Sequence, residues 1–78
     1  MASERATSRR YRVQAGEHAG VVTAATPLDA ARTYARRRWL GEGWAVMVSG
    51  RPEPGREPAM QTFISVLKPG CVPDVRLP

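Results

Sequence analysis

One segment of the chain, residues 26–41, has the pattern of an α-helix, and it restricts the fold to arrangements in which a single helix packs against strands. Thr26 suits the N-cap position, and Pro27 suits the first helical position because its missing N–H is not needed there. At the other end, the arginines at residues 36–38 complement the negative end of the helix dipole. Gly41 is expected to end the helix in the left-handed conformation that glycine adopts readily.

The apolar residues of this segment recur at spacings of three and four, which predicts one buried side of the helix. This stripe consists of Leu28, Ala31, Ala35 and Trp39, with Tyr34 on its edge. Trp39 is the largest of these side chains, so we expect it to anchor the helix in the core. Trp44, at the start of the apolar run that follows the helix, is also expected in the core.

The remaining segments are typical of strands and of irregular connections. Alternation predicts strands at residues 9–15 and 59–68, and an apolar run predicts one at 44–49. Residues 21–25 are also expected to be extended and to form a hairpin with 9–15 through a turn bracketed by glycines. We expect a mobile N-terminal tail over residues 1–8, a proline-rich surface loop over 50–58, and over 69–78 an irregular C-terminal tail or at most a short edge segment. A single globular domain is therefore expected over residues 9–68.

Together these elements predict an α+β fold of β-β-α-β-β order. Because one helix covers only one face of a sheet, we expect it to pack across one face of a four-stranded antiparallel sheet. A right-handed crossover through the helix would give the spatial strand order 2-1-3-4. At 78 residues, the chain is near the size at which one core is only just sufficient for stability.

The face of the sheet that the helix leaves uncovered is the first candidate for function. The alternation of the strands is interpreted as turning these residues toward the helix: Tyr11, Val13, Val46, Val48, Ile64 and Val66. The opposite face would then carry Arg10, Arg12, Met47, Phe63 and Leu67. Aromatic residues, methionine and arginine are enriched in interfaces, so this face is predicted to bind a partner. Two alternatives stay open: the assignment is inverted for residues 59–68, or the C-terminal segment covers the face.

The net charge of +5 comes almost wholly from arginine, with eleven arginines against one lysine. Arginine makes forked contacts with phosphates and carboxylates, which predicts an acidic partner, either nucleic acid or an acidic protein surface. The alternative is the codon bias of a GC-rich genome. The helical arginines are further candidates, although dipole complementation and shielding of Trp39 would also explain one or two of them. The predicted partner-binding residues are Arg10, Arg12, Arg32, Arg36, Arg37, Met47 and Phe63.

The residue types used in catalysis are few and scattered. His18 stands alone in a turn, and Cys71 follows Pro-Gly without a neighbouring base. One histidine and one cysteine do not make a zinc site, and the glycines form no phosphate-binding fingerprint. We therefore expect no catalytic residue, no metal and no cofactor. The absence of a long apolar run or secretory signal and the single cysteine favour a soluble protein of the cytoplasm.

Two runs of the sequence, GVVTAATPLDAAR at residues 20–32 and GWAVMV at 43–48, resemble small phage-encoded anti-CRISPR proteins directed at type I systems. The resemblance covers roughly a third of the chain and concerns its architecture of one helix across an antiparallel sheet. It implies a protein without enzymatic activity that binds a type I Cas surveillance complex in the bacterial cytoplasm and blocks engagement of target DNA. No binding residue is carried over by a motif.

Two other functions remain open from the sequence. A small basic nucleic-acid-binding or antitoxin-like module would use the same arginines. A homodimeric structural protein would use the same uncovered face as its interface.

Overall fold

The helix and strands follow one another along the chain in an order that confirms the α+β class. The computed structural model describes residues 8–50, 55 and 60–78. The elements are β1 (Arg9–Ala15), β2 (His18–Ala24), α1 (Pro27–Arg38), β3 (Ala45–Ser49), β4 (Met60–Lys68) and β5 (Val72–Arg76). The sheet has five strands instead of the four expected. The mobile tail expected over residues 1–8 and the loop expected over 50–58 lie almost entirely outside the described residues.

All neighbouring strands of the sheet are antiparallel, in the order β2-β1-β3-β4-β5. The expected order of the first four strands is confirmed. Of the two alternatives expected over residues 69–78, the irregular tail is wrong and the short edge segment is what forms, because the chain reverses there and adds β5 as an edge strand. In this turn Gly70 has a positive φ of 90°, and the Cys71 N–H donates to the Lys68 carbonyl at 2.8 Å. Pro73 is tolerated within β5 because an edge strand has one unpaired side.

The β1–β2 hairpin is longer than the sequence predicts. Its second strand begins at His18 instead of residue 21, and the turn shrinks to Gly16 and Glu17. Gly16 has a φ of 59°, whereas Glu17 does not have a positive φ. A positive φ at the first of the two turn residues alone is the type II′ pattern, which matches the twist of a hairpin.

Helix α1 begins where it was predicted to begin but ends earlier. Thr26 caps it, since its Oγ1 accepts the Asp29 N–H at 3.1 Å. Trp39 then adopts a left-handed conformation with a φ of 52°, and the Leu40 N–H donates to the Ala35 carbonyl at 3.0 Å. This is the Schellman closure of a helix. Gly41 is therefore not the residue that ends the helix.

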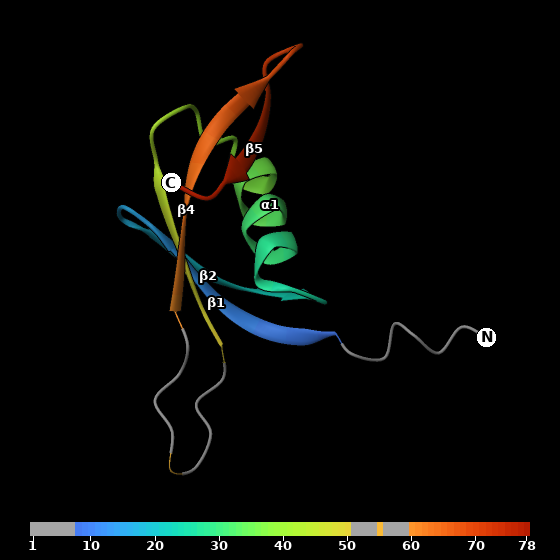
Figure 1. Cartoon of the computed structure of the whole chain (residues 1–78), viewed down its shortest axis with the longest axis vertical. Helices are drawn as coiled ribbons and strands as arrows, with labels where there is room; N and C mark the ends of the chain where they lie inside the picture. Colours follow the sequence, from blue (N-terminus) through green and yellow to red (C-terminus); the bar gives the residue numbers. More distant parts are fainter. Residues whose placement is uncertain (1–7, 51–54, 56–59) are drawn as a thin grey trace, which may run out of the picture.

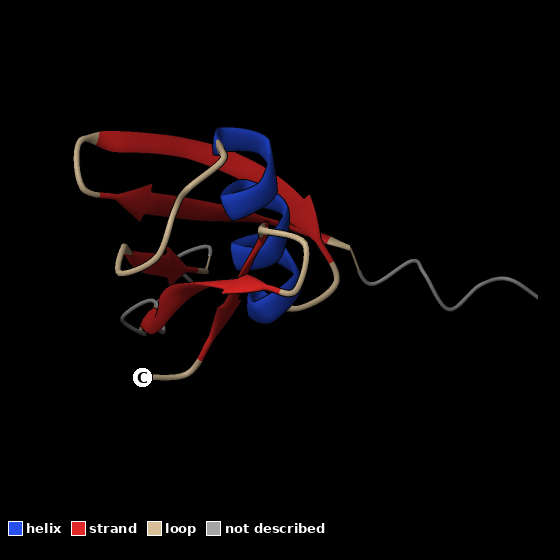
Figure 2. Ribbon diagram, turned by 90° about the horizontal axis from the view of Figure 1, so that it is seen from above, coloured by secondary structure: helices blue, strands red, loops and turns tan. Residues whose placement is uncertain are grey.

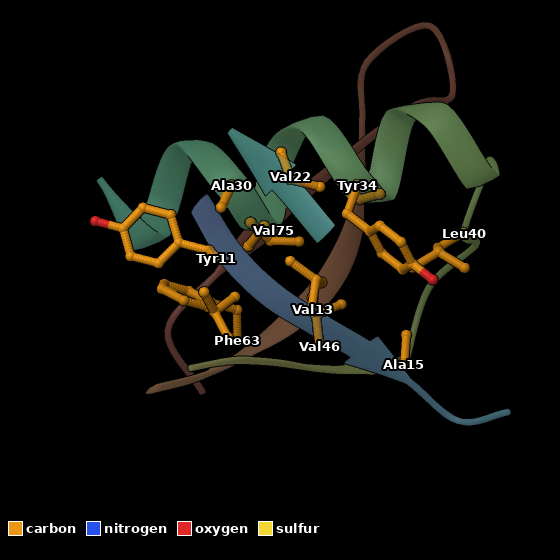
Figure 3. Close-up of a cluster of buried hydrophobic side chains, with 13 residues drawn as sticks. Tyr11, Val13, Ala15, Val22, Ala30, Tyr34, Leu40, Val46, Phe63 and Val75 are labelled. Carbon is orange, nitrogen blue, oxygen red and sulfur yellow. The ribbon is translucent and has the colours of Figure 1, made fainter. Parts of the chain in front are cut away.

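The early ending changes which side chain anchors the helix. Trp39 is 72% exposed, so its predicted role as a core anchor is wrong, and Leu40 is buried in its place. Trp44 is also exposed and does not belong to the core. Figure 3 shows side chains of the helix and the sheet turned toward each other. The core consists of Tyr11, Val13, Ala15, Val22, Ala30, Ala31, Tyr34, Ala35, Leu40, Val46, Val48, Phe63 and Val75.

Seen from above, the strands curve around α1, which lies against one face of the sheet (Figure 2). In Figure 1, α1 runs beside β5. The register corrects the face assignment of β4. Phe63 pairs with Val46 and is only 3% exposed, so it belongs to the face that α1 covers. Ile64 and Val66 lie on the other face. Residues 60–67 carry apolar side chains on both sides, and polar Gln61 and Ser65 share the covered side with Phe63, so their alternation does not indicate which side is inside.

Candidate functional site

The face of the sheet turned away from α1, here called the outer face, is not covered by any described helix or strand (Figure 2). Its residues alternate with the core residues along each strand. It consists of Arg10, Arg12 and Gln14 on β1, Ala19, Val21 and Thr23 on β2, Ala45, Met47 and Ser49 on β3, and Met60, Thr62, Ile64 and Val66 on β4.

The register of the strands brings three of the predicted site residues together on this face. Arg12 lies between Val21 on β2 and Ser49 on β3. In the next row, Met47 lies beside Gln14 of β1. Arg10 and Arg12 are two residues apart on one strand, which separates their Cα atoms by about 7 Å. The outer face therefore combines two neighbouring guanidinium groups with an apolar surface.

The charge of the outer face is entirely positive over its first four strands. Strands β1 to β4 contain no aspartate or glutamate. Arg10 and Arg12 are exposed, and neither forms an ion pair with another described residue. Their guanidinium groups are free to make the bidentate contacts that arginine forms with phosphates and carboxylates.

Arg32 lies on α1, away from the outer face, and its guanidinium group already forms an ion pair with Asp74. Its Nε donates to Oδ1 of Asp74 on β5 at 3.1 Å. Asp74 is 1% exposed, its Oδ2 lies 2.6 Å from Lys68 Nζ, and its Oδ1 also accepts the Val75 N–H at 2.8 Å. Burial by itself raises the pKa of Asp74, but the hydrogen bonds from Lys68 and Val75 and the charges of Arg32 and Lys68 outweigh it and lower the pKa. Arg32 therefore ties α1 to β5.

The remaining predicted residues do not join the outer face. Arg36 and Arg37 are exposed on the last turn of α1, and the helix and the sheet lie between them and the outer face. The guanidinium of Arg38 lies 5.9 Å from the centre of the Tyr34 ring, a cation–π contact. Phe63 was expected on the outer face and instead lies in the core. Only Arg10, Arg12 and Met47 are brought together.

Trp44 is a candidate that the sequence interpretation missed. Its ring packs over Gly16, where an added Cβ would lie 2.7 Å from Cζ3 of the indole. The imidazole of His18 lies beside it, with ring centres 5.7 Å apart. Gly16, Trp44 and Met47 border an open hollow of about 420 Å³, which Glu42 also lines. The contact joins residues 16 and 44, which no local sequence pattern relates.

Residues 8–50, 55 and 60–78 hold no cluster of three histidine, cysteine or acidic side chains that could bind a metal ion. Cys71 is an exposed free thiol in the turn before β5. No helix within the described ranges is both long and apolar enough to cross a membrane.

Comparison with family models, with curated proteins and with solved structures gives no match.

Proposed function

We propose that this protein is a non-enzymatic binding protein that engages an anionic macromolecular surface through the outer face of its sheet. One observation carries the proposal: an uncovered sheet face presents Arg10 and Arg12 on the same side as Met47, and the strands that form most of it contain no acidic residue. Such a face attracts phosphates or carboxylates at long range, and its apolar rows supply contact area.

The resemblance to type I anti-CRISPR proteins gives the proposal its specific form. The partner is then a Cas surveillance complex, and the arginines contact an acidic surface of that complex. Binding blocks engagement of target DNA. The site of action is the bacterial cytoplasm.

A second candidate function is direct binding of nucleic acid, favoured by the aromatic pair of Trp44 and His18 beside the turn of the β1–β2 hairpin. The rings of Trp44 and His18 lie in contact, Trp44 borders the hollow, and His18 pairs with Ala15 of the arginine-bearing strand β1. Aromatic side chains next to a basic surface are the usual stacking platforms for unpaired bases. In this form the guanidinium groups of Arg10 and Arg12 bind the phosphates.

The test compares two charge reversals of equal size on the two arginine-bearing surfaces. The double substitution Arg10→Glu/Arg12→Glu alters the outer face, and Arg36→Glu/Arg37→Glu alters the helix and serves as the matched control. All four residues are exposed, so each variant should fold with a small change in stability. We expect the outer-face variant to lose binding and the helix variant to keep it.

Two binding measurements with these variants separate the candidate functions. Co-purification with a type I surveillance complex, together with protection of that complex from target DNA, tests the anti-CRISPR form. Gel shifts with single-stranded and duplex DNA in the absence of Cas protein test direct nucleic-acid binding. Equal behaviour of the two variants in every assay would show that the outer face is not the binding surface.

A further inference from the structure

We propose that strand β2 pairs with β2 of a second copy of this chain, joining two sheets edge to edge around a two-fold axis at Val21. The inference starts from the free edge of the sheet. In the described part of the chain, β2 hydrogen-bonds with β1 alone and is the terminal strand of the sheet. An unpaired strand edge is a template for another strand unless it is protected.

The two edges of this sheet differ in protection. The β5 edge contains Pro73 and the charged residues Asp74 and Arg76, and α1 runs alongside this strand (Figure 1). Proline and charge are the usual devices that prevent edge pairing. Strand β2 has the sequence HAGVVTA, with neither proline nor a carboxylate, lysine or arginine. Val21 at its centre is 57% exposed. The unprotected edge is the one that would pair.

The turn geometry determines which backbone groups of β2 are free. In a two-residue hairpin the flanking residues, here Ala15 and His18, form a hydrogen-bonded pair. Counting along the register, Gly20, Val22 and Ala24 bond to β1 in alternate pairs. The N–H and C=O groups of Ala19, Val21 and Thr23 then point to the open edge.

A second copy fits these groups because the strand is complementary to itself. With Val21 opposite Val21 of the second copy, Ala19 faces Thr23 in both directions, so every edge-directed group finds a partner. The side chains that meet are small and uncharged. The charged strand β1 is set back, so Arg12 and its symmetry mate would lie three strand spacings apart, about 14 Å. That exceeds the Debye length of about 8 Å at physiological ionic strength, so their repulsion is screened.

Amide hydrogen exchange of the wild-type protein tests the pairing without any substitution. Across a dilution series, the amides of Gly20, Val22 and Ala24 should stay protected because they bond to β1. The amides of Val21, Ala19 and Thr23 should be protected at high concentration and exchange freely on dilution. Light scattering should show a mass twice the 8.5 kDa of the chain at high concentration. A monomer at every concentration, with these three amides unprotected, would overturn the proposal.

A pair of substitutions at Val21 locates the interface. Val21→Pro removes the edge-directed N–H and leaves the β1–β2 ladder intact, so it should raise the dimer dissociation constant roughly tenfold or more. Val21→Thr keeps the N–H and the β-branched shape and should leave the dimer unchanged. A dimer that survives Val21→Pro but dissociates on Met47→Glu would place the interface on the outer face and contradict edge pairing.

Discussion

At Trp39, the first residue after α1, the backbone conformation determines whether the large indole side chain is buried or exposed. The left-handed φ of 52° directs the chain away from the helical stripe, so the indole stays in solvent while Leu40 enters the core. The left-handed region costs a residue with a side chain about 1–2 kcal/mol. Glycine is the residue usually found at this position of a helix end.

We therefore predict that Trp39→Gly stabilises the protein by up to about 1 kcal/mol. The gain is the relieved strain minus the larger conformational entropy that glycine has in the unfolded chain. Chemical denaturation measures it. Trp39→Ala is the matched control: it keeps the strain and removes only an exposed side chain, so it should change stability by less than about 0.5 kcal/mol. A loss of several kcal/mol in either variant would mean that Trp39 is buried.

Strand β5 is held to the rest of the fold by one buried carboxylate. Asp74 on β5 receives hydrogen bonds from Arg32 of α1 and from its own neighbour Val75, and it pairs with Lys68 at the end of β4. Three elements thus converge on a single side chain that is nearly inaccessible to solvent. This cluster therefore helps to hold β5, which the sequence predicted at most as a short edge segment, against α1 and β4.

Asp74→Asn should therefore destabilise the protein at neutral pH by about 1–3 kcal/mol, because two charge-assisted contacts are weakened. The pKa of Asp74 is lowered in the folded state, so its contribution is complete above the unfolded value of about 3.9 and is lost as pH falls through the folded pKa. Urea denaturation from pH 7 down to pH 2 should show that the difference in free energy of unfolding between the wild type and Asp74→Asn shrinks as the pH falls. If the free energies of unfolding of the two proteins differed by the same amount at every pH in this range, the stabilising role of the Asp74 carboxylate would be contradicted.

The elements that could be predicted are those with local causes. The Thr26 cap, the single helix and four of the strands follow from capping chemistry and from short-range alternation. The phase of β4 could not be predicted, because it carries apolar side chains on both sides and only pairing with Val46 selects Phe63 for the core. Likewise β5 contains a proline and two charges, and it is stabilised by pairing with β4, by burial of Val75 and by the contacts of Asp74 to Arg32 and Lys68.

The same division applies to the candidate site. Arg10, Arg12 and Met47 were placed on one face by the alternation of β1 and β3, which the register confirms. Sequence spacing could not show that Arg32 is occupied by Asp74 or that Trp44 packs on Gly16, since both contacts join distant parts of the chain. The number of residues between Arg32 and Asp74, or between Gly16 and Trp44, does not indicate how close the two side chains lie in the folded protein.

At the scale of the whole molecule, the proposed edge pairing and the proposed binding face act together. Pairing through β2 would place both outer faces on one continuous sheet, with Arg10 and Arg12 of each copy set back from the two-fold axis by one strand. The basic surface would double in length without any new charge in the sequence. A partner long enough to cross the axis would then contact four arginines in place of two.

This coupling predicts a difference in salt dependence between dimer and monomer. With duplex DNA as the anionic partner, each phosphate contact contributes about −0.9 to the slope of log K against log salt concentration. The wild-type dimer should then show a slope of about −4, and the monomeric Val21→Pro variant a slope of about −2 together with weaker binding. Arg10→Glu/Arg12→Glu should abolish the slope while the amides of β2 stay protected, because these side chains take no part in the edge contact. Equal slopes for the wild type and Val21→Pro would show that the two faces bind independently, even if both the dimer and the binding face are real.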